Sequence, residues 1–185
     1  HYQTARRELP AAKERLRLLR EQAVAAIAAF DQALAMARGQ GAPRDAQAAW
    51  LELTKTREGL NQAVAESRFL AAKEGADQGT ARVKEVLEQI TTARNTLQQR
   101  LREADEGFLA AAVDTTFFTA NLAEEWAGVV AAHGLLTQAL ANKEDIVSLL
   151  GHTEALKTKL DAVVARRNEM VAGLTATKDR LEALR

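Results

Sequence analysis

Apolar residues in the C-terminal part of the chain recur at alternating steps of four and three residues. This 3.5-residue period is typical of a helix that packs along a continuous seam. Two threonines and one arginine share the seam with the apolar residues. The seam positions are Leu149, Thr153, Leu156, Leu160, Val163, Arg167, Met170, Leu174, Thr177, Leu181 and Leu184. The pattern predicts a coiled-coil-like helix over residues 143–185.

Apolar stripes at helical spacing predict three further helices upstream. Glycine-containing segments separate them, because Gly39–Pro43 is the clearest loop signal and Gly75–Gly79 is a second turn signal. The predicted helices span residues 4–38, 44–74 and 80–141.

The third of these helices leaves two alternatives open. Thr115 and Thr116 are weak helix formers because they branch at Cβ. Asn121, followed three residues later by Glu124, has the form of a helix N-cap. Either one kinked helix covers 80–141, or a break near Asn121 makes two helices.

These elements predict an all-α fold, a single antiparallel up-down helical bundle over 1–185 with four principal long helices. A tandem or kinked bundle is the alternative. The helix–turn–helix segments 33–51 and 69–87 also echo each other, which would fit an internal duplication.

Composition agrees with a slender helical protein. Hydrophobic residues make up 47% of the chain but aromatic residues only 4%. The 25 basic residues balance 25 acidic ones, so the chain lacks the basic surplus with which nucleic-acid-binding proteins displace counterions. The absence of cysteine excludes disulfides and thiolate zinc sites.

No motif for catalysis or for cofactor binding is present in the sequence. The three histidines, His1, His133 and His152, are not spaced as paired metal ligands. Neither a glycine-rich phosphate loop nor a nucleophile elbow occurs. We therefore expect no enzyme, no cofactor and no metal site.

Two arginines stand where the apolar stripes would place an apolar residue: Arg94 between Ile90 and Leu97, and Arg167 between Val163 and Met170. A guanidinium inside a bundle must be paired or reach water, because an unpaired buried charge is costly. One alternative is a salt bridge or an extended side chain. The other is a fork for a ligand carboxylate with neutral hydrogen-bonding side chains around it. This candidate ligand site comprises Arg68, Arg94, Arg167, Thr115, Thr116 and Asn121.

The segment Glu66–Gly75 resembles a recurring hairpin in helical extracytoplasmic sensor domains of bacterial chemoreceptors and histidine kinases, of the four-helix-bundle or helical bimodular type. Arg68, the pair Phe69-Leu70 and the glycine carry the resemblance, whereas Asp77 comes later than the usual turn aspartate. The resemblance implies a periplasmic domain of an inner-membrane protein that forms a homodimer. It also implies a small organic acid or an amino acid as ligand.

Two functions are therefore expected. The first is a periplasmic ligand-sensing domain of a bacterial transmembrane receptor, which transmits binding through its terminal helix. The alternative is a non-catalytic coiled-coil scaffold or protein-interaction module. Contact with a membrane is expected only through flanking segments, because no apolar stretch of this sequence has the length of a bilayer span. A sensor predicts a pocket lined by the arginines, and a scaffold predicts the arginines in salt bridges or exposed.

A membrane-active helical toxin is a third alternative. Its support is the apolar patch around Phe108–Leu122, which polar residues interrupt.

Overall fold

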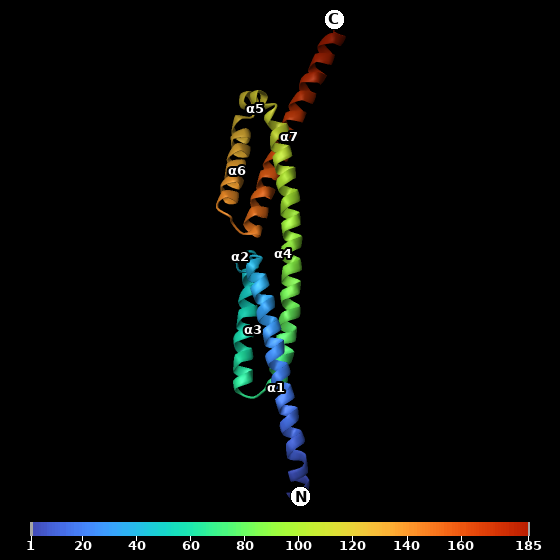
Figure 1. Ribbon diagram of the computed structural model, residues 1–185. Coiled ribbons are helices and arrows are strands. Elements are labelled where there is room, and N and C mark those ends of the chain that lie inside the picture. Colours follow the sequence, from blue (N-terminus) through green and yellow to red (C-terminus); the bar gives the residue numbers. More distant parts are fainter. Residues whose placement is uncertain (1, 185) are drawn as a thin grey trace. The chain divides into compact units, whose positions relative to one another are not determined.

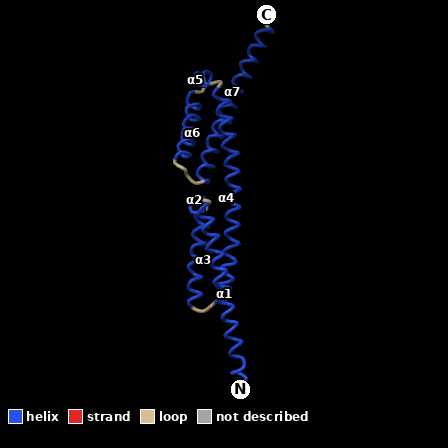
Figure 2. Tube along the Cα trace, viewed as in Figure 1, coloured by secondary structure: helices blue, strands red, loops and turns tan. Residues whose placement is uncertain are grey.

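The computed structural model describes residues 2–184 and the side chains of residues 8–184. Every regular element in this range is a helix, and short loops connect the helices (Figures 1 and 2). The helices are α1 (Tyr2–Gly39), α2 (Ala42–Asp45), α3 (Gln47–Ala65), α4 (Phe69–Ala112), α5 (Thr115–Asn121), α6 (Ala123–Ala141) and α7 (Ile146–Ala183).

The chain divides between Thr92 and Ala93 into two compact units. Unit 1 contains α1, α2, α3 and the first part of α4, and unit 2 contains the rest of α4 with α5, α6 and α7. In each unit three long helical segments lie side by side, and consecutive ones run in opposite directions (Figure 1). The all-α class and the antiparallel packing of long helices are thus confirmed.

Helix α4 carries a seam of 3.5-residue period along its whole length. Small residues occupy several seam positions, which lets neighbouring helices approach closely. The buried seam positions are Phe69, Ala72, Ala76, Gly79, Val83, Val86, Ile90, Leu97, Ala104 and Ala111. One helix thereby supplies core residues to both units.

The turn predicted at Gly75–Gly79 is wrong, because this segment lies inside α4. Its glycines serve close packing. A Cβ on Gly75 would lie 2.9 Å from Leu60 Cδ2 of α3, and a Cβ on Gly79 would lie 2.7 Å from Phe30 Cζ of α1. Lys73 and Asp77 form an ion pair of 2.6 Å one helical turn apart. The predicted helix boundaries at 74 and 80 are therefore wrong as well.

The chain reverses instead at Glu66–Arg68. Ser67 adopts a left-handed conformation with φ of 59°, and the Arg68 N–H donates to the Ala63 carbonyl at 2.8 Å. The α6–α7 turn repeats this geometry. Lys143 has φ of 54°, and the Glu144 N–H donates to the Ala139 carbonyl at 3.1 Å. Glycine usually marks such a cap, so Ser67 gave no signal for the first turn. The second turn lies where the predicted helices end at 141 and begin at 143, because α6 ends at Ala141 and α7 begins at Ile146.

Two breaks interrupt the segment 80–141, so the continuous alternative for this segment is wrong. The first break lies between Ala112 and Thr115, and the second lies at Leu122, where φ is −140° and ψ is 46°. The chain therefore breaks beside Asn121, as the second alternative held. Helix α5 lies between the two breaks and is anchored by Phe118, which is fully buried.

The two units repeat one plan: a long helix, a short helix, a 19-residue helix, a turn with positive φ and a second long helix. The 19-residue helices are α3 and α6. The residues that precede them, Ala46 and Leu122, have nearly the same backbone conformation, with φ and ψ of −144° and 50° against −140° and 46°. Trp50 and Trp126 are both the fourth residue of their helix.

The core positions of the long helices match in the same way. The buried positions from Phe69 to Val86 of α4 correspond one to one with those from Ile146 to Val163 of α7. Along the first helices, Ala23, Phe30 and Ala37 of α1 correspond to Leu97, Ala104 and Ala111 of α4. The repeat expected between segments 33–51 and 69–87 is therefore wrong. The segments that repeat are unit 1 and unit 2.

Candidate functional site

Arg68, one of the residues behind the receptor resemblance, lies in the α3–α4 turn. Its Nε donates to Glu66 Oε2 at 2.7 Å, and 56% of its side chain is exposed. Hydrogen bonds from Gln62 and from Arg68 hold the pKa of Glu66 below its ordinary value. The guanidinium is thus engaged by a neighbour on the surface of unit 1.

Arg167 lies on the α7 seam and forms an ion pair of 2.7 Å with Asp114, the residue before α5. The side chains are 35% and 34% exposed, so water screens the pair. This contact ties α7 to the connection that follows α4. The pair between Arg167 and Asp114 is the salt bridge that was expected as one alternative for an arginine on the seam.

The neutral candidate residues all belong to α5. The Thr115 hydroxyl donates to the Ala112 carbonyl at 2.5 Å, and the Asn121 side-chain amide donates to the Phe117 carbonyl at 2.9 Å. Thr116 is exposed. Thr115 follows the aspartate that Arg167 binds, but its hydroxyl and the Asn121 amide are bonded to nearby main-chain carbonyls. Such local bonds compete with a ligand.

Arg94 lies beside the α4 seam, although the sequence pattern placed it on the seam. The seam passes from Ile90 through Ala93 to Leu97 at steps of three and four, so Arg94 flanks it. The side chain is half-buried in the first turn of unit 2. The error of one residue arises because stripes of 3.5 and 3.6 residues are indistinguishable over one turn.

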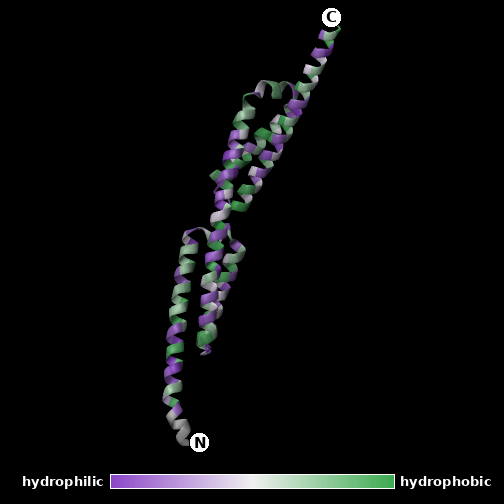
Figure 3. Ribbon diagram, turned by 90° about the vertical axis from the view of Figure 1, so that its right-hand side faces the viewer, coloured by the Kyte–Doolittle hydropathy of each residue, from purple (hydrophilic) through white to green (hydrophobic). Residues whose placement is uncertain are grey.

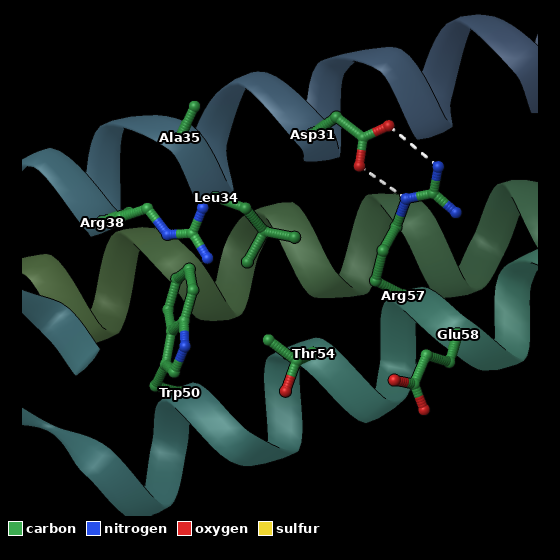
Figure 4. A pocket seen from close by; sticks show the side chains of 8 residues that line it. All are labelled: Asp31, Leu34, Ala35, Arg38, Trp50, Thr54, Arg57 and Glu58. Carbon is green, nitrogen blue, oxygen red and sulfur yellow. Dashed lines mark hydrogen bonds and ion pairs between the residues drawn. The ribbon is translucent and has the colours of Figure 1, made fainter.

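A hollow of about 370 Å³ opens between α1 and α3 in unit 1 (Figure 4). It combines apolar side chains with two acidic and two basic ones, so its wall carries no net charge. The lining residues are Asp31, Leu34, Ala35, Arg38, Trp50, Thr54, Arg57 and Glu58.

Both arginines of this hollow have partners. Arg57 forms a forked ion pair with Asp31, in which the Nη2–Oδ2 distance is 2.9 Å, and this hydrogen bonding raises the pKa of Arg57 above its ordinary value. Arg38 lies over the Trp50 ring, with Cζ 5.7 Å from the ring centroid. Sequence reasoning missed this site, because its charged residues come from two helices and share no common spacing.

Aromatic rings form part of the core of unit 2. The Phe108 and His133 rings stack with centroids 4.0 Å apart, and the Phe118 and Trp126 rings stack at 5.0 Å. Trp126 is therefore a packing residue, and the His133 ring packs on Phe108. Within residues 2–184, no group of three or more histidine, aspartate or glutamate side chains is placed to hold a metal ion.

Two seams continue past the packed parts of their helices. Leu9 and Leu16 of α1 are 55% and 51% exposed, and Leu174 and Leu181 of α7 are 66% and 60% exposed. Figure 3 shows hydrophobic and hydrophilic residues alternating along both helices into these segments. These positions have the period of the buried seams but no covering helix in the described part of the chain.

No family model matches the sequence, and comparisons with curated proteins and with solved structures gave no match either. Among the helices described, none has an apolar stretch long enough to cross a bilayer. The finding that stands is an all-helical protein of long antiparallel helices, with no family identified.

Proposed function

We propose that this protein is a non-catalytic helical scaffold that binds other proteins along its long helices. The observation that carries the proposal is the duplicated three-helix unit, whose shared seam runs through α4 from Phe69 to Ala111. Repetition of a helical unit multiplies surface for binding without requiring a catalytic centre. The mostly exposed apolar positions at the ends of α1 and α7 supply such surface.

The candidate ligand residues support the same proposal. Arg167 is paired with Asp114, and Arg68 is paired with Glu66. A ligand carboxylate would have to displace a carboxylate of the same chain, whose effective concentration is on the order of millimolar or higher. Paired arginines are therefore poor forks for a weakly binding metabolite.

A thermal-shift screen against amino acids and organic acids tests the proposal. A ligand at a hundredfold excess over its dissociation constant would add about 2.7 kcal/mol to the free energy of unfolding. For a chain of this size that corresponds to a rise in melting temperature of about 5–10 °C. We expect no rise with any member of the panel. A rise that disappears in Arg167→Ala, but persists in the matched surface variant Lys157→Ala, would overturn the scaffold proposal.

The sensor domain of a bacterial receptor is the second candidate function. The observation that favours it is the hollow between α1 and α3, whose volume would admit a small ligand. Under this candidate the protein is periplasmic and homodimeric. A thermal shift that is lost on Arg38→Ala would favour the sensor over the scaffold.

A further inference from the structure

The α7 seam leaves the core of unit 2 in the middle of the helix. Leu156 and Val163 are 0% and 1% exposed, Met170 is half-buried, and Leu174 and Leu184 are 66% and 84% exposed. The spacing of the seam residues stays the same beyond Met170, although the exposed fraction of their side chains rises there. We call residues 170–184 the α7 extension. Its apolar stripe continues an established helix–helix interface without a helix to cover it.

The duplication shows what such a stripe meets when it is covered. The register that aligns α7 with α4 places Leu174 and Leu181 at the positions of Leu97 and Ala104. In α4 these positions are 9% and 3% exposed, because helices of unit 2 cover them. The α7 extension thus has the pattern of a helix that a further helix covers, and none of the described helices covers it.

The charges of α7 are segregated about its seam. In heptad notation the seam residues occupy positions a and d, positions e and g flank them, and b, c and f face outward. Within α7, all acidic residues are at outward positions, whereas all basic residues are at seam or flanking positions. The acidic residues are Glu154, Asp161, Glu169, Asp179 and Glu182, and the basic residues are Lys157, Lys159, Arg166, Arg167, Lys178 and Arg180.

The helix that covers α7 in unit 2 carries no lysine or arginine. Helix α6 packs antiparallel to α7, and its only formally charged residues are Glu124 and Glu125. In the α7 extension, Lys178 and Arg180 flank the exposed stripe. The Lys178 side chain is 74% exposed and forms a long, solvent-screened ion pair of 3.8 Å with Glu182. Opposite charges at flanking positions select the partner in helix–helix packing.

We propose that the α7 extension is a docking site for an amphipathic helix of a partner protein, whose apolar seam is flanked by acidic residues. This inference rests on the scaffold function proposed above. It names the chemistry of the partner, and it locates the contact at Leu174 and Leu181 with Lys178 and Arg180 on either side.

A second copy of the chain is a poorer occupant of this site. Two paired α7 extensions would have Lys178 and Arg180 at flanking positions and no acidic flanking residue to attract them. The exposed α1 stripe is also flanked mainly by basic residues, among them Lys13, Arg15 and Arg20. Like charges at flanking positions disfavour both pairings.

An anionic membrane is a poorer occupant as well. Helices that lie in a lipid interface bury a broad apolar face, often with tryptophan or phenylalanine. The apolar stripe of the α7 extension is narrow, and its residues are Met170, Val171, Leu174, Leu181 and Leu184.

Fluorescence anisotropy with a labelled synthetic peptide tests the inference. The probe is a helix of about three heptads with leucine at a and d and glutamate at e and g, and its control has lysine at e and g. We expect the full chain to bind the acidic peptide at least about tenfold more tightly than the basic peptide. The preference should diminish as salt is raised, because the flanking charges are exposed.

Three double variants locate the site. L174A/L181A should weaken binding of the acidic peptide at least about tenfold, and K178E/R180E should reverse the preference between the peptides. K55E/K84E reverses two exposed lysines of unit 1 and should change the affinity by less than about twofold. Circular dichroism checks that each variant keeps the helical content of the wild type.

Equal binding of the two peptides, or binding that L174A/L181A leaves intact, overturns the inference. Sedimentation that finds a dimer dissolved by L174A/L181A would assign the site to a second copy. Binding to phosphatidylserine vesicles that K178E/R180E abolishes, without peptide binding, would assign it to lipid. None of these results contradicts the scaffold function if no metabolite raises the melting temperature. Failure of the docking inference can therefore be distinguished from failure of the scaffold proposal.

Discussion

Replacement of Gly79 with alanine tests the close approach of α1 to α4 in unit 1. A Cβ at this position would lie 2.7 Å from Phe30 Cζ and 2.9 Å from both Cε atoms of the ring. Phe30 is fully buried, so close-packed neighbours oppose movement of the ring. We expect Gly79→Ala to destabilise unit 1, although alanine is the better helix former.

Two opposing effects set the magnitude. Alanine in place of glycine inside a helix is favourable by about 0.5–1 kcal/mol. Insertion of a methyl group into a filled core costs about 1–3 kcal/mol. The net expectation is a loss of about 1 kcal/mol, and at most about 2.5 kcal/mol. Gly59→Ala in α3 is the matched control. Apart from neighbouring atoms of the helix itself, nothing lies within 4 Å of a Cβ there, so this variant should gain about 0.5–1 kcal/mol.

Urea unfolding followed by the fluorescence of Trp50 measures both variants. The chain has 2 tryptophans, one in each unit, so a Trp126→Phe background leaves Trp50 to report on unit 1. In a Phe30→Leu background the clashing ring atoms are absent, and Gly79→Ala should there become stabilising. If Gly79→Ala is at least as stable as Gly59→Ala, or if its loss is unchanged by Phe30→Leu, the packing argument is refuted.

Four further substitutions test other parts of the molecule. Asp145→Ala removes the carboxylate that accepts the Ser148 N–H at the start of α7 and should cost about 1 kcal/mol in urea unfolding at neutral pH. Because this hydrogen bond lowers the pKa of Asp145, its contribution is complete above the ordinary aspartate pKa and is lost as pH falls through the lower folded-state pKa, so wild type and variant should converge in acid. Leu156→Ala, at a fully buried position, should lower the free energy of unfolding by about 2–5 kcal/mol. Leu174→Ala, at a position that is 66% exposed, should change it by no more than about 0.5 kcal/mol. Thermal melts of both variants measure the difference. Arg167→Ala should cost about 1 kcal/mol or less, because water screens its pair with Asp114; a loss above about 3 kcal/mol in chemical denaturation would place that pair in the core instead.

The all-α class and the α7 seam could be predicted because a period in the sequence reflects burial directly. Leu149, Leu156 and Val163 are all buried as expected. Thr153 fits the core because its hydroxyl donates to the Leu150 carbonyl at 2.8 Å. The part of the seam beyond Met170 could not be distinguished from the buried part, because periodicity does not reveal whether a partner helix is present.

Helix boundaries were harder to predict because residue types have more than one use. Gly79 favours a turn in isolation, but in α4 it makes room for Phe30. Ser67 carries no turn signal in isolation, but it adopts the left-handed conformation at the end of α3. In both cases tertiary contacts override local preference.

The candidate site depended on contacts between helices, which spacing along one helix does not encode. The fork between Arg57 and Asp31 joins residues 26 positions apart on different helices. Arg167 was recognised as an unusual seam residue, but Asp114, which pairs with it, was visible only as a break in the apolar patch. Sequence alone therefore indicated which charges needed a partner and left the partner unknown.

The repeat of the two units is hard to recognise in the sequence because several equivalent core positions hold side chains of different size. In unit 1 the first helix contributes the large Phe30, and the third contributes Gly79, against which the ring packs. At the equivalent positions of unit 2 the first helix contributes the small Ala104 and the third contributes Leu156, both in one buried cluster. A core tolerates such exchanges when its total volume and pattern are kept. Burial is therefore preserved at these positions although residue identity is not, whereas Leu60 and Leu136, like Val86 and Val163, keep both.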